Sequence, residues 1–366
     1  MMADQQQCEH DNRRTGQLTP GGPLSRYRAQ PRVRALTAHS VPLGYLGHRD
    51  SRPGLKDGPL LCSVAKVEWV YPAARIVTVN GRALAVEDLG PETGFPVIMH
   101  NGAGSRHLFP PAVAEGQRQG FRLIGYDRPG CGGSTAMPGR VIADCVSDVQ
   151  AIMTELGITQ AAAWGSSGGG PYALATAAKL PEAVTVVCVF ASIGPYGMPD
   201  LDFADGLGGD EFREEIRKIL EEPELARSDF RAKSAITLAQ RGSSDWWLVR
   251  WGDRAGRDPA HSSEWADYLA VCTRDALGAN LSGSFDDEGW WEDENAVYRP
   301  WGFDLANIQA PVRIWHGMQD FLPVAHARWL AGRIPKVTTN FPADEDHTNI
   351  EENNRAAAFA WLAAHI

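Results

Sequence analysis

One pentapeptide of this 366-residue chain has the residue types and spacing of a serine nucleophile. Gly165-Ser166-Ser167-Gly168-Gly169 fits the pattern G-x-S-x-G, and the apolar run Ala161–Trp164 before it is typical of a buried strand. A serine on a sharp turn between strand and helix is held with its hydroxyl clear of the sheet. Ser167 is the predicted nucleophile, because choosing Ser166 would put Trp164 in place of the first glycine. An ordinary loop rich in glycine and serine is the alternative.

A serine hydroxyl needs a general base and a carboxylate that orients the base. In folds with this turn the carboxylate and then the histidine follow the serine in the chain. Asp320 follows the apolar run Val312–Trp315, which is a predicted strand. His347 follows the next predicted strand, Val337–Phe341. We therefore predict that His347 is the base and Asp320 its orienting partner. The alternatives are that Asp320 merely caps a helix and that His347 is a solvated loop residue.

Other histidines and carboxylates are poorer candidates for these two roles. His316 lies at the end of the strand before Asp320 and is expected in the core or behind the site. The segment Ala191–Gly194, another place where this carboxylate can occur, contains none, which favours Asp320. The remaining competitors lie in a helix, in the inserted segment, at the terminus or too close to His347 in sequence: His326, His261, His365, Asp344 and Asp346.

The negative charge that forms on an attacked carbonyl oxygen needs backbone N–H donors, which make up the oxyanion hole. One donor is expected at Gly168, the residue after the nucleophile. The second is expected in the loop His100–Arg106, whose small residues let the backbone approach a substrate, and we assign it to Gly102. An ordinary turn is the alternative for this loop. The predicted chemistry, an acyl-enzyme cycle, needs no metal ion and no organic cofactor.

Short apolar runs that alternate with helical patterns predict the elements that position these residues. Asn80-Gly81 joins two alternating runs within Arg75–Glu87, which is the strongest short signal of a β-hairpin. Strands that alternate with helices indicate an α/β fold, with a mostly parallel twisted sheet and helices on both faces. Further buried strands are predicted at Val97–Met99, Leu123–Tyr126 and Val184–Phe190, and helices at Val141–Leu156, Pro171–Lys179, Asp210–Glu222, Ser262–Leu277 and Glu351–Ala364.

The alternation stops between about residues 195 and 300, where the chain becomes acidic, helical and rich in tryptophan. We interpret this segment as a helical cap inserted over the carboxyl edge of the strands, where ligands of such sheets bind. The predicted organisation is a disordered leader at 1–65, the first part of the core at 66–194, the cap at 195–300 and the second part of the core at 301–366. The leader shows no lasting apolar period that could offset the ordering of its chain.

Charge and composition exclude several classes of function. Of the net charge of −10, residues 1–66 contribute +5 and the remaining residues −15, and an acidic body argues against a nucleic-acid partner. No apolar run approaches the ~18 residues of a membrane span, and the first residues lack a secretory signal. The six cysteines are spread without a CxxC pair, as expected for free thiols in the cytoplasm. The oligomeric state is left open.

Together these motifs resemble those of the α/β-hydrolase superfamily, from about Val77 to the C-terminus. His100–Arg106 is similar to the H-G-x-P-G-S-R loop of members with a cap, with Asn101 and Ala103 replacing the usual Gly and Pro. Asp127–Ser134 resembles the D-R-P-G-x-G-x-S loop, which we interpret as structural. The resemblance implies an α/β-hydrolase fold with a Ser-His-Asp triad. Branches with an aspartate nucleophile are disfavoured by Ser167, whereas esterases, enol-lactonases, carbon–carbon bond hydrolases and peptidases stay open.

The inserted segment is expected to set the specificity for a small-molecule substrate. Its net charge of −11 favours a neutral or cationic substrate, and its six tryptophans favour one with apolar bulk. The alternative is that the acidic residues are solvated and the tryptophans serve packing. A serine hydrolase that acts on carboxylic esters is the predicted function. An aminopeptidase-like enzyme, a carbon–carbon bond hydrolase and a non-catalytic ligand-binding protein are the alternatives.

Overall fold

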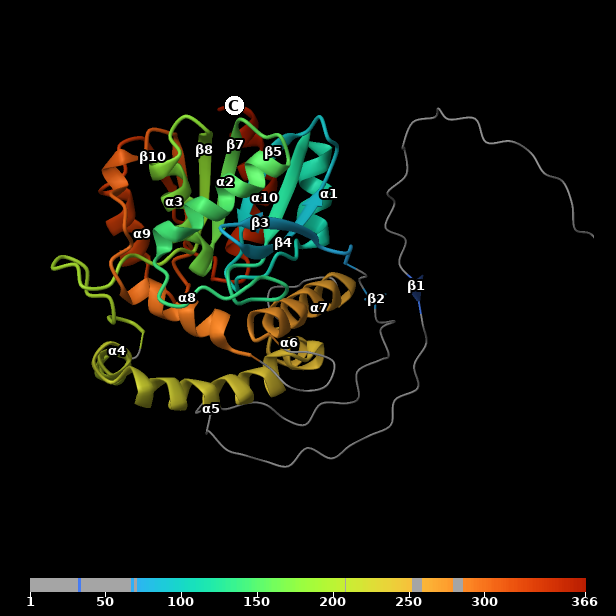
Figure 1. Cartoon of the computed structure of the whole chain (residues 1–366). Coiled ribbons are helices and arrows are strands. Elements are labelled where there is room, and N and C mark those ends of the chain that lie inside the picture. The colour runs from blue at the N-terminus through green and yellow to red at the C-terminus, as the bar shows by residue number, and fades with distance from the viewer. Residues whose placement is uncertain (1–31, 34–66, 69–70, 208, 252–258, 279–285) are drawn as a thin grey trace, which may run out of the picture.

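A computed structural model of the chain describes residues 32–33, 67–68, 71–207, 209–251, 259–278 and 286–366. Its main element is an eight-stranded sheet in the order β10-β9-β8-β7-β5-β6-β4-β3 (Figure 1). All neighbouring strands from β10 to β6 are parallel, whereas β4 is antiparallel to both of its neighbours. The strands are β3 (Arg75–Val79), β4 (Arg82–Leu89), β5 (Phe95–His100), β6 (Phe121–Tyr126), β7 (Ala161–Ser166), β8 (Val184–Phe190), β9 (Val312–Trp315) and β10 (Val337–Asn340).

The mostly parallel sheet confirms the fold class predicted from the alternating pattern. The hairpin of β3 and β4 turns at Asn80 and Gly81, which have φ values of 48° and 78°. A two-residue turn of this kind needs positive φ at both positions, and asparagine and glycine adopt it most easily. The strands predicted from Val97 to Trp315 lie within observed strands, and the one predicted at Val337–Phe341 ends one residue earlier, at Asn340.

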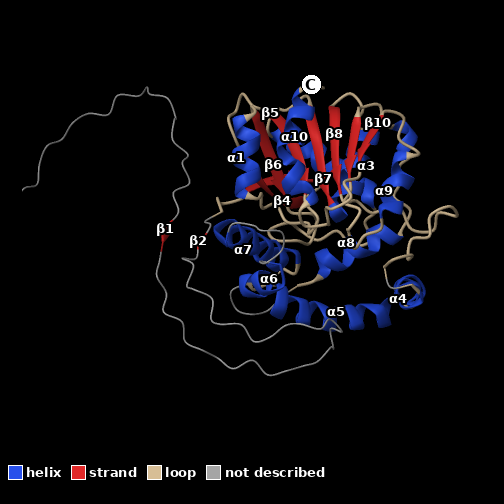
Figure 2. Ribbon diagram, turned by 180° about the vertical axis from the view of Figure 1, so that it is seen from behind, coloured by secondary structure: helices blue, strands red, loops and turns tan. Residues whose placement is uncertain are grey.

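Helices cover both faces of the sheet (Figure 2). On one face Trp164 of β7 stacks on Phe190 of β8 at 4.8 Å between ring centroids, and Phe190 stacks on Trp315 of β9 at 4.7 Å. Phe359 of α10 packs against Trp164 in the same cluster. Residues of α3 and α9 fill the core on the other face. The helices are α1 (Pro110–Arg118) and α10 (Ile350–Ala363) on the first face, and α2 (Cys145–Glu155), α3 (Gly170–Lys179) and α9 (Val324–Ala331) on the second.

In its described residues, the segment between β8 and β9 forms five α-helices, which we call the α4–α8 layer. They are α4 (Asp210–Glu221), α5 (Pro223–Arg241), α6 (Ser244–Trp251), α7 (Pro259–Ala276) and α8 (Glu288–Tyr298). The layer lies at one end of the sheet, away from the C-terminus of the chain (Figures 1 and 2). The helices predicted at Asp210–Glu222 and Ser262–Leu277 correspond to α4 and α7. The one predicted from Val141 begins instead with a 3₁₀ turn at Ile142–Asp144.

Most of the predicted leader at 1–65 lies outside the described residues. Within it, Arg32–Val33 forms β1, which pairs antiparallel with β2 (Val67–Glu68). In the described part of the chain, none of the helices has the length and apolarity that a membrane crossing requires.

Candidate active site

Ser167 lies on the turn between β7 and α3. Its φ of 53° is in the left-handed region, which few residues other than glycine adopt. The turn packs directly on the end of β5, since a Cβ at Gly169 would lie only 1.8 Å from the carbonyl oxygen of His100. Glycine is therefore needed at position 169 for the turn to approach β5. The strained turn places the Ser167 hydroxyl beside the loop that follows β5.

His347 lies between Ser167 and Asp320. Its Nε2 is 3.0 Å from Ser167 Oγ, and its Nδ1 is 2.9 and 3.0 Å from the two carboxylate oxygens of Asp320. A carboxylate accepts hydrogen bonds, so this geometry assigns the ring proton to Nδ1 and leaves the lone pair of Nε2 facing the serine hydroxyl. The structure thus brings together the three residues that the sequence analysis selected.

The Asp320 side chain is fully buried and is held by its own loop. It accepts a hydrogen bond of 2.8 Å from the backbone N–H of Leu322. His316, the competing histidine, donates from Nε2 to the Leu322 carbonyl at 2.7 Å and lies behind Asp320 at 3.8 Å. Burial lowers the pKa of His316, so it is a neutral residue behind the site at neutral pH. This agrees with the expectation for His316.

The loops after β9 and β10 are joined by backbone hydrogen bonds. The N–H of Met318 donates to the Pro342 carbonyl and the N–H of Gln319 to the Glu345 carbonyl, both at 2.9 Å. These bonds fix the relative position of Asp320 and His347, which are 27 residues apart in the chain. The orientation of His347 is therefore set by both loops.

Gly102 and Gly168, the predicted oxyanion donors, both line a cavity together with Ser167. A Cβ at Gly102 would lie 3.1 Å from the Cβ of Ser167, so this loop is in contact with the serine. Asn101, which departs from the family pattern, donates from Nδ2 to the carbonyls of Ser105 and His107, both at 2.8 Å. The asparagine side chain thus closes the loop on itself.

The cavity in front of Ser167 has a volume of about 240 Å³. Its apolar wall comes from the segment after β8, from α8 and from the loop after β9: Ile193, Trp290, Val297, Tyr298, Phe321 and Leu322. Of the tryptophans of the α4–α8 layer, Trp290 lines the cavity, whereas Trp291 packs on Phe230. Trp246, Trp247 and Trp265 form a separate aromatic cluster, and the side chain of Trp251 lies outside the described part.

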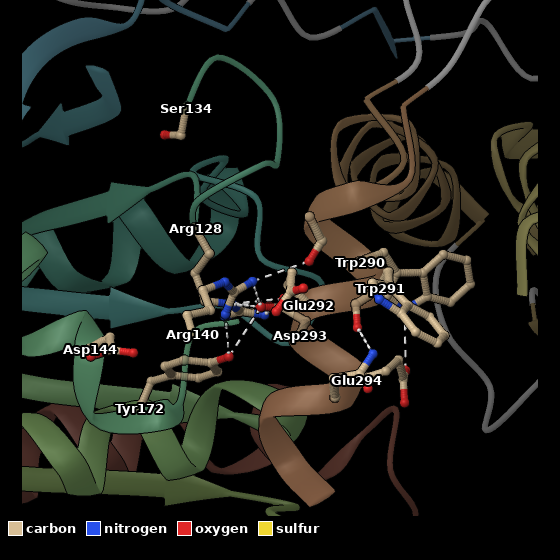
Figure 3. Close-up of polar contacts among 12 residues, drawn as sticks. Arg128, Ser134, Arg140, Asp144, Tyr172, Trp290, Trp291, Glu292, Asp293 and Glu294 are labelled. Carbon is tan, nitrogen blue, oxygen red and sulfur yellow. Dashed lines mark hydrogen bonds and ion pairs between the residues drawn. The ribbon is translucent and has the colours of Figure 1, made fainter. Parts of the chain in front are cut away.

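Charged residues also line the cavity, and the sequence analysis missed their role. Arg128 donates to Asp293 of α8 from Nε at 2.8 Å and from Nη2 at 2.6 Å, and Arg140 contacts the same carboxylate (Figure 3). Burial alone would raise the pKa of Asp293, but the charges of Arg128 and Arg140 outweigh it and lower the pKa to about 2. Asp293 is therefore a permanent anion between two guanidinium groups.

Glu294, the neighbour of Asp293, faces the cavity from α8. Its carboxylate accepts a hydrogen bond of 3.2 Å from Trp290 Nε1 and one of 3.4 Å from the Tyr298 hydroxyl. Burial raises the pKa of Glu294. Of the charged residues that line the cavity, Arg128 and Asp293 are thus paired with each other. Among the described residues, no group of three or more His, Cys, Asp or Glu is arranged to hold a metal ion.

A family model described as the alpha/beta hydrolase fold matches residues 96–354, which is more than half of the chain. Among curated proteins, a stretch of 127 residues is 33% identical to the dihydrolipoyllysine-residue acetyltransferase component of the acetoin cleaving system of Pseudomonas putida. The match covers 34% of this chain and 34% of that protein. The chain therefore spans about a third of the length of this relative.

Solved structures of hydrolases have a similar fold. An enol-lactonase from Burkholderia xenovorans is 21% identical with a TM-score of 0.54, and the match covers 80% of this chain and 99% of that one. An esterase from Rhodococcus is 22% identical with a TM-score of 0.54, and one from Exiguobacterium antarcticum is 20% identical with a TM-score of 0.55. Both esterase matches cover 80% of this chain and 99% of the other. At these identities the likeness shows a shared fold.

Proposed function

The chain belongs to the α/β-hydrolase fold family, and from that premise we propose that it is a serine hydrolase that cleaves small carboxylic esters or lactones. The supporting observation is the hydrogen-bonded chain from Ser167 through His347 to Asp320, with 3.0 Å at its first link and 2.9 Å at its second. The family assignment supports hydrolase activity in general. The residue roles and the substrate class are the proposal.

Acylation begins when Ser167 Oγ attacks the ester carbonyl and its proton passes to His347 Nε2. Asp320 keeps the ring oriented and stabilises the imidazolium that forms. The N–H groups of Gly102 and Gly168 bind the oxyanion of the tetrahedral intermediate. The C–O bond to the leaving group then breaks, His347 protonates the departing alcohol, and Ser167 carries the acyl group.

Deacylation repeats these steps with water as the nucleophile. His347 takes a proton from the water as its oxygen attacks the acyl carbonyl, and the same two N–H groups hold the second oxyanion. When this intermediate collapses, the proton on His347 returns to Ser167 Oγ and the free acid leaves. The net reaction converts one ester and one water into an acid and an alcohol, with no further reactant.

A neutral substrate with a small apolar acyl group fits the cavity best. The wall residues are mainly apolar, and the volume of about 240 Å³ suits a small acyl group. Arg128 and Asp293 line the cavity and are paired with each other, and burial disfavours the charged form of Glu294, so no strong net charge attracts an ionic substrate. We propose that the layer acts as the cap, with limits near residues 195 and 300.

An aminopeptidase-like activity is the second candidate, because Glu294 could accept a substrate ammonium group in the cavity. Burial disfavours the charged form of Glu294 and raises its pKa, which weakens this candidate, because an ammonium group would bind to the charged form. A cytoplasmic location is also proposed. It is supported by the free thiols of Cys131, Cys145, Cys188 and Cys272, all four of them buried.

Labelling with a fluorophosphonate, combined with p-nitrophenyl esters of increasing acyl length and aminoacyl anilides, tests the proposal. We expect labelling of the wild type, hydrolysis of the short esters, and a loss of kcat on the order of 10⁴–10⁶ in Ser167→Ala. Ser166→Ala is the matched control, because Ser166 contacts Glu351 instead of His347 and the variant should keep its labelling. An unlabelled wild type would support the non-catalytic alternative, and labelled Ser167→Ala would exclude this serine as the nucleophile.

A further inference from the structure

Arg128 connects the loop after β5 with helix α8. Its Nη1 donates to the carbonyl of Asn101 at 2.5 Å and its Nη2 to the carbonyl of Gly102 at 2.9 Å. On the other side its Nε and Nη2 donate to the two oxygens of Asp293. Arg128 is almost fully buried, at 2% exposure. Two consecutive carbonyls of the loop are thus held by one guanidinium, which is itself held by α8.

The bond to the Asn101 carbonyl fixes the direction of the Gly102 N–H. Both groups belong to the same peptide unit, which is planar and, as no cis peptide occurs in the described chain, trans. In a trans peptide the C=O and N–H point in opposite directions. Because Arg128 holds the carbonyl on its own side, the Gly102 N–H is turned away from Arg128. A rotation of this peptide would break the hydrogen bond of 2.5 Å.

The guanidinium has almost no capacity left for a substrate. Four of its five N–H directions go to Asp293, Asn101 and Gly102, and its face lies 4.5 Å from the centre of the Tyr172 ring. Although Arg128 borders the cavity, its donors are therefore used by the protein. This distinguishes it from an arginine that binds a substrate carboxylate.

Helix α8 is seated closely enough for Asp293 to reach Arg128. A Cβ at Gly289, in the first turn of α8, would lie 2.3 Å from the carbonyl carbon of Gly130, so the helix and the loop after β6 touch backbone to backbone. Arg140 donates from Nη1 to the Tyr172 hydroxyl at 2.8 Å and holds the other side of Asp293. In the described part of the chain, the hydrogen bonds of Arg140 go to Tyr172, Gly289 and Asp293, and none goes to the carbonyl of Asn101 or Gly102.

We propose that Arg128 is a positioning residue that holds the Gly102 N–H in the orientation needed to bind the oxyanion. Because Arg128 is itself bound by Asp293, this orientation depends on the position of α8 over the strand ends. The inference rests on the proposed function. It gives the α4–α8 layer a part in turnover in addition to shaping the cavity. Displacement of α8 would release Arg128, and with it the peptide that carries one oxyanion donor.

Arg128→Lys and Arg140→Lys form a matched pair for the test, because both arginines are buried and both contact Asp293. Lysine keeps the charge, but as a point charge it cannot hold two carbonyls and a carboxylate in the planar fork of a guanidinium. The readouts are kcat and KM on the best p-nitrophenyl ester, the inhibition constant of a trifluoromethyl ketone, and the thermal midpoint. The ketone forms an oxyanion on the serine, so its affinity reports the oxyanion hole.

We expect Arg128→Lys to lower kcat by about 10²-fold, with KM within about threefold of the wild type and the ketone weakened in step with kcat. Arg140→Lys should lower the thermal midpoint comparably and kcat far less. Equal losses of kcat in the two variants would reduce Arg128 to a structural role, and a raised KM with unchanged kcat would make it a substrate-binding residue. Either result overturns the inference.

If Arg128→Lys does not fold, Asp293→Asn decides by the same criteria, since it releases the guanidinium from α8 and keeps the side-chain size. A wild type that neither reacts with the fluorophosphonate nor cleaves an ester refutes the proposed function, and the inference with it. A reactive wild type whose Arg128→Lys and Asp293→Asn variants keep kcat refutes the inference alone.

Discussion

Two helices of the α4–α8 layer contact the same loop after β5, and they do so with different chemistry. In the α8 contact, Asp293 binds Arg128 and Arg140, whose charges do not change in the working pH range. In the α7 contact, Asp275 binds His107 Nε2 at 2.9 Å and lies 3.5 Å from Arg106. Only the α7 contact contains a group that titrates near neutral pH.

The two contacts also differ in what they hold. The α8 contact reaches the carbonyls of Asn101 and Gly102, next to Ser167, whereas the α7 contact reaches Ser105 and His107, farther along the loop. The contact next to the proposed nucleophile thus consists of groups with fixed charges, whereas the contact farther along the loop contains a titratable histidine. The comparison indicates that pH should change the stability of the layer more than the geometry of the oxyanion hole.

The largest effect is expected from Gly289→Val, which blocks the backbone contact of the α8 attachment. The Cβ would lie 2.3 Å from the carbonyl carbon of Gly130, and the backbone there cannot yield as a side chain would. We expect kcat to fall by about 10²–10³, as for loss of an oxyanion donor, and stability by about 1–3 kcal/mol. Steady-state kinetics and thermal unfolding measure both.

Gly120→Ala is the control for this variant. It also replaces a glycine, here one with a positive φ of 86°, but a Cβ there would meet nothing within 4 Å. It should cost about 1 kcal/mol and leave kcat unchanged. If Gly289→Val kept its kcat, the seating of α8 would not matter for turnover.

A smaller effect on kcat is expected from charge removal, which separates the two contacts directly. Asp293→Asn leaves two buried guanidinium groups without a counter-ion, and breaking a buried pair in this way costs about 3–5 kcal/mol. Asp275→Asn removes a more exposed carboxylate, at 22% against 11%, and should cost less and leave kcat within about threefold. Parallel kinetics and denaturant titrations compare them.

Glu294→Gln is the control for the removal of a negative charge from α8. Glu294 is next to Asp293 in sequence, but its hydrogen bonds come from Trp290 and Tyr298 and not from Arg128 or Arg140. It should leave the hydrolysis of neutral esters nearly unchanged. Equal losses of kcat in Asp293→Asn and Asp275→Asn would remove the distinction between the two contacts.

The smallest effect is a pH dependence that belongs to the α7 contact. Burial opposes the protonation of His107, but the carboxylates of Asp275, at 2.9 Å, and of Glu87, at 3.6 Å, outweigh burial and raise its pKa above 6.5. A group with a raised folded-state pKa contributes its full stability below the unfolded value of about 6.5 and loses it as pH rises through the folded-state value. The free energy of unfolding of the wild type should therefore exceed that of His107→Gln, and the difference should be larger at pH 5.5 than at pH 8.5.

Denaturant titrations of both proteins across this range measure the difference. A difference that is constant with pH, or that grows toward pH 8.5, would mean that His107 is not protonated in the contact. The difference in free energy of unfolding between the wild type and Arg140→Lys should stay constant over this range, because the α8 contact holds no histidine.

The turn around Ser167 could be predicted from the local sequence, and the reason is physical. The strand, the glycine spacing and the helix around Ser167 lie within about 20 residues, so the turn is encoded where it forms. Asp320 and His347 were found because the loops after parallel strands meet at one edge of the sheet. The structure brings all three side chains within hydrogen-bond distance.

The contacts between distant segments could not be predicted. Arg128 and Asp293 are 165 residues apart, and neither belongs to a periodic pattern that indicates the other. Arg128 was interpreted only as part of a structural loop, and Asp293 as one of many acidic residues in the insertion. A sequence signal existed in Gly289, whose missing side chain permits close approach, but glycine alone does not identify its neighbour.

The backbone of Ser167 has a consequence for how such a protein can change over evolutionary time. Its φ of 53° would be adopted by glycine without strain, whereas an L-residue there costs about 1–2 kcal/mol. The residue that we propose as the nucleophile therefore stands where the backbone favours glycine. On that proposal, replacing the serine by glycine would relieve strain, so this turn would set no folding barrier to descent from a hydrolase to a ligand-binding protein.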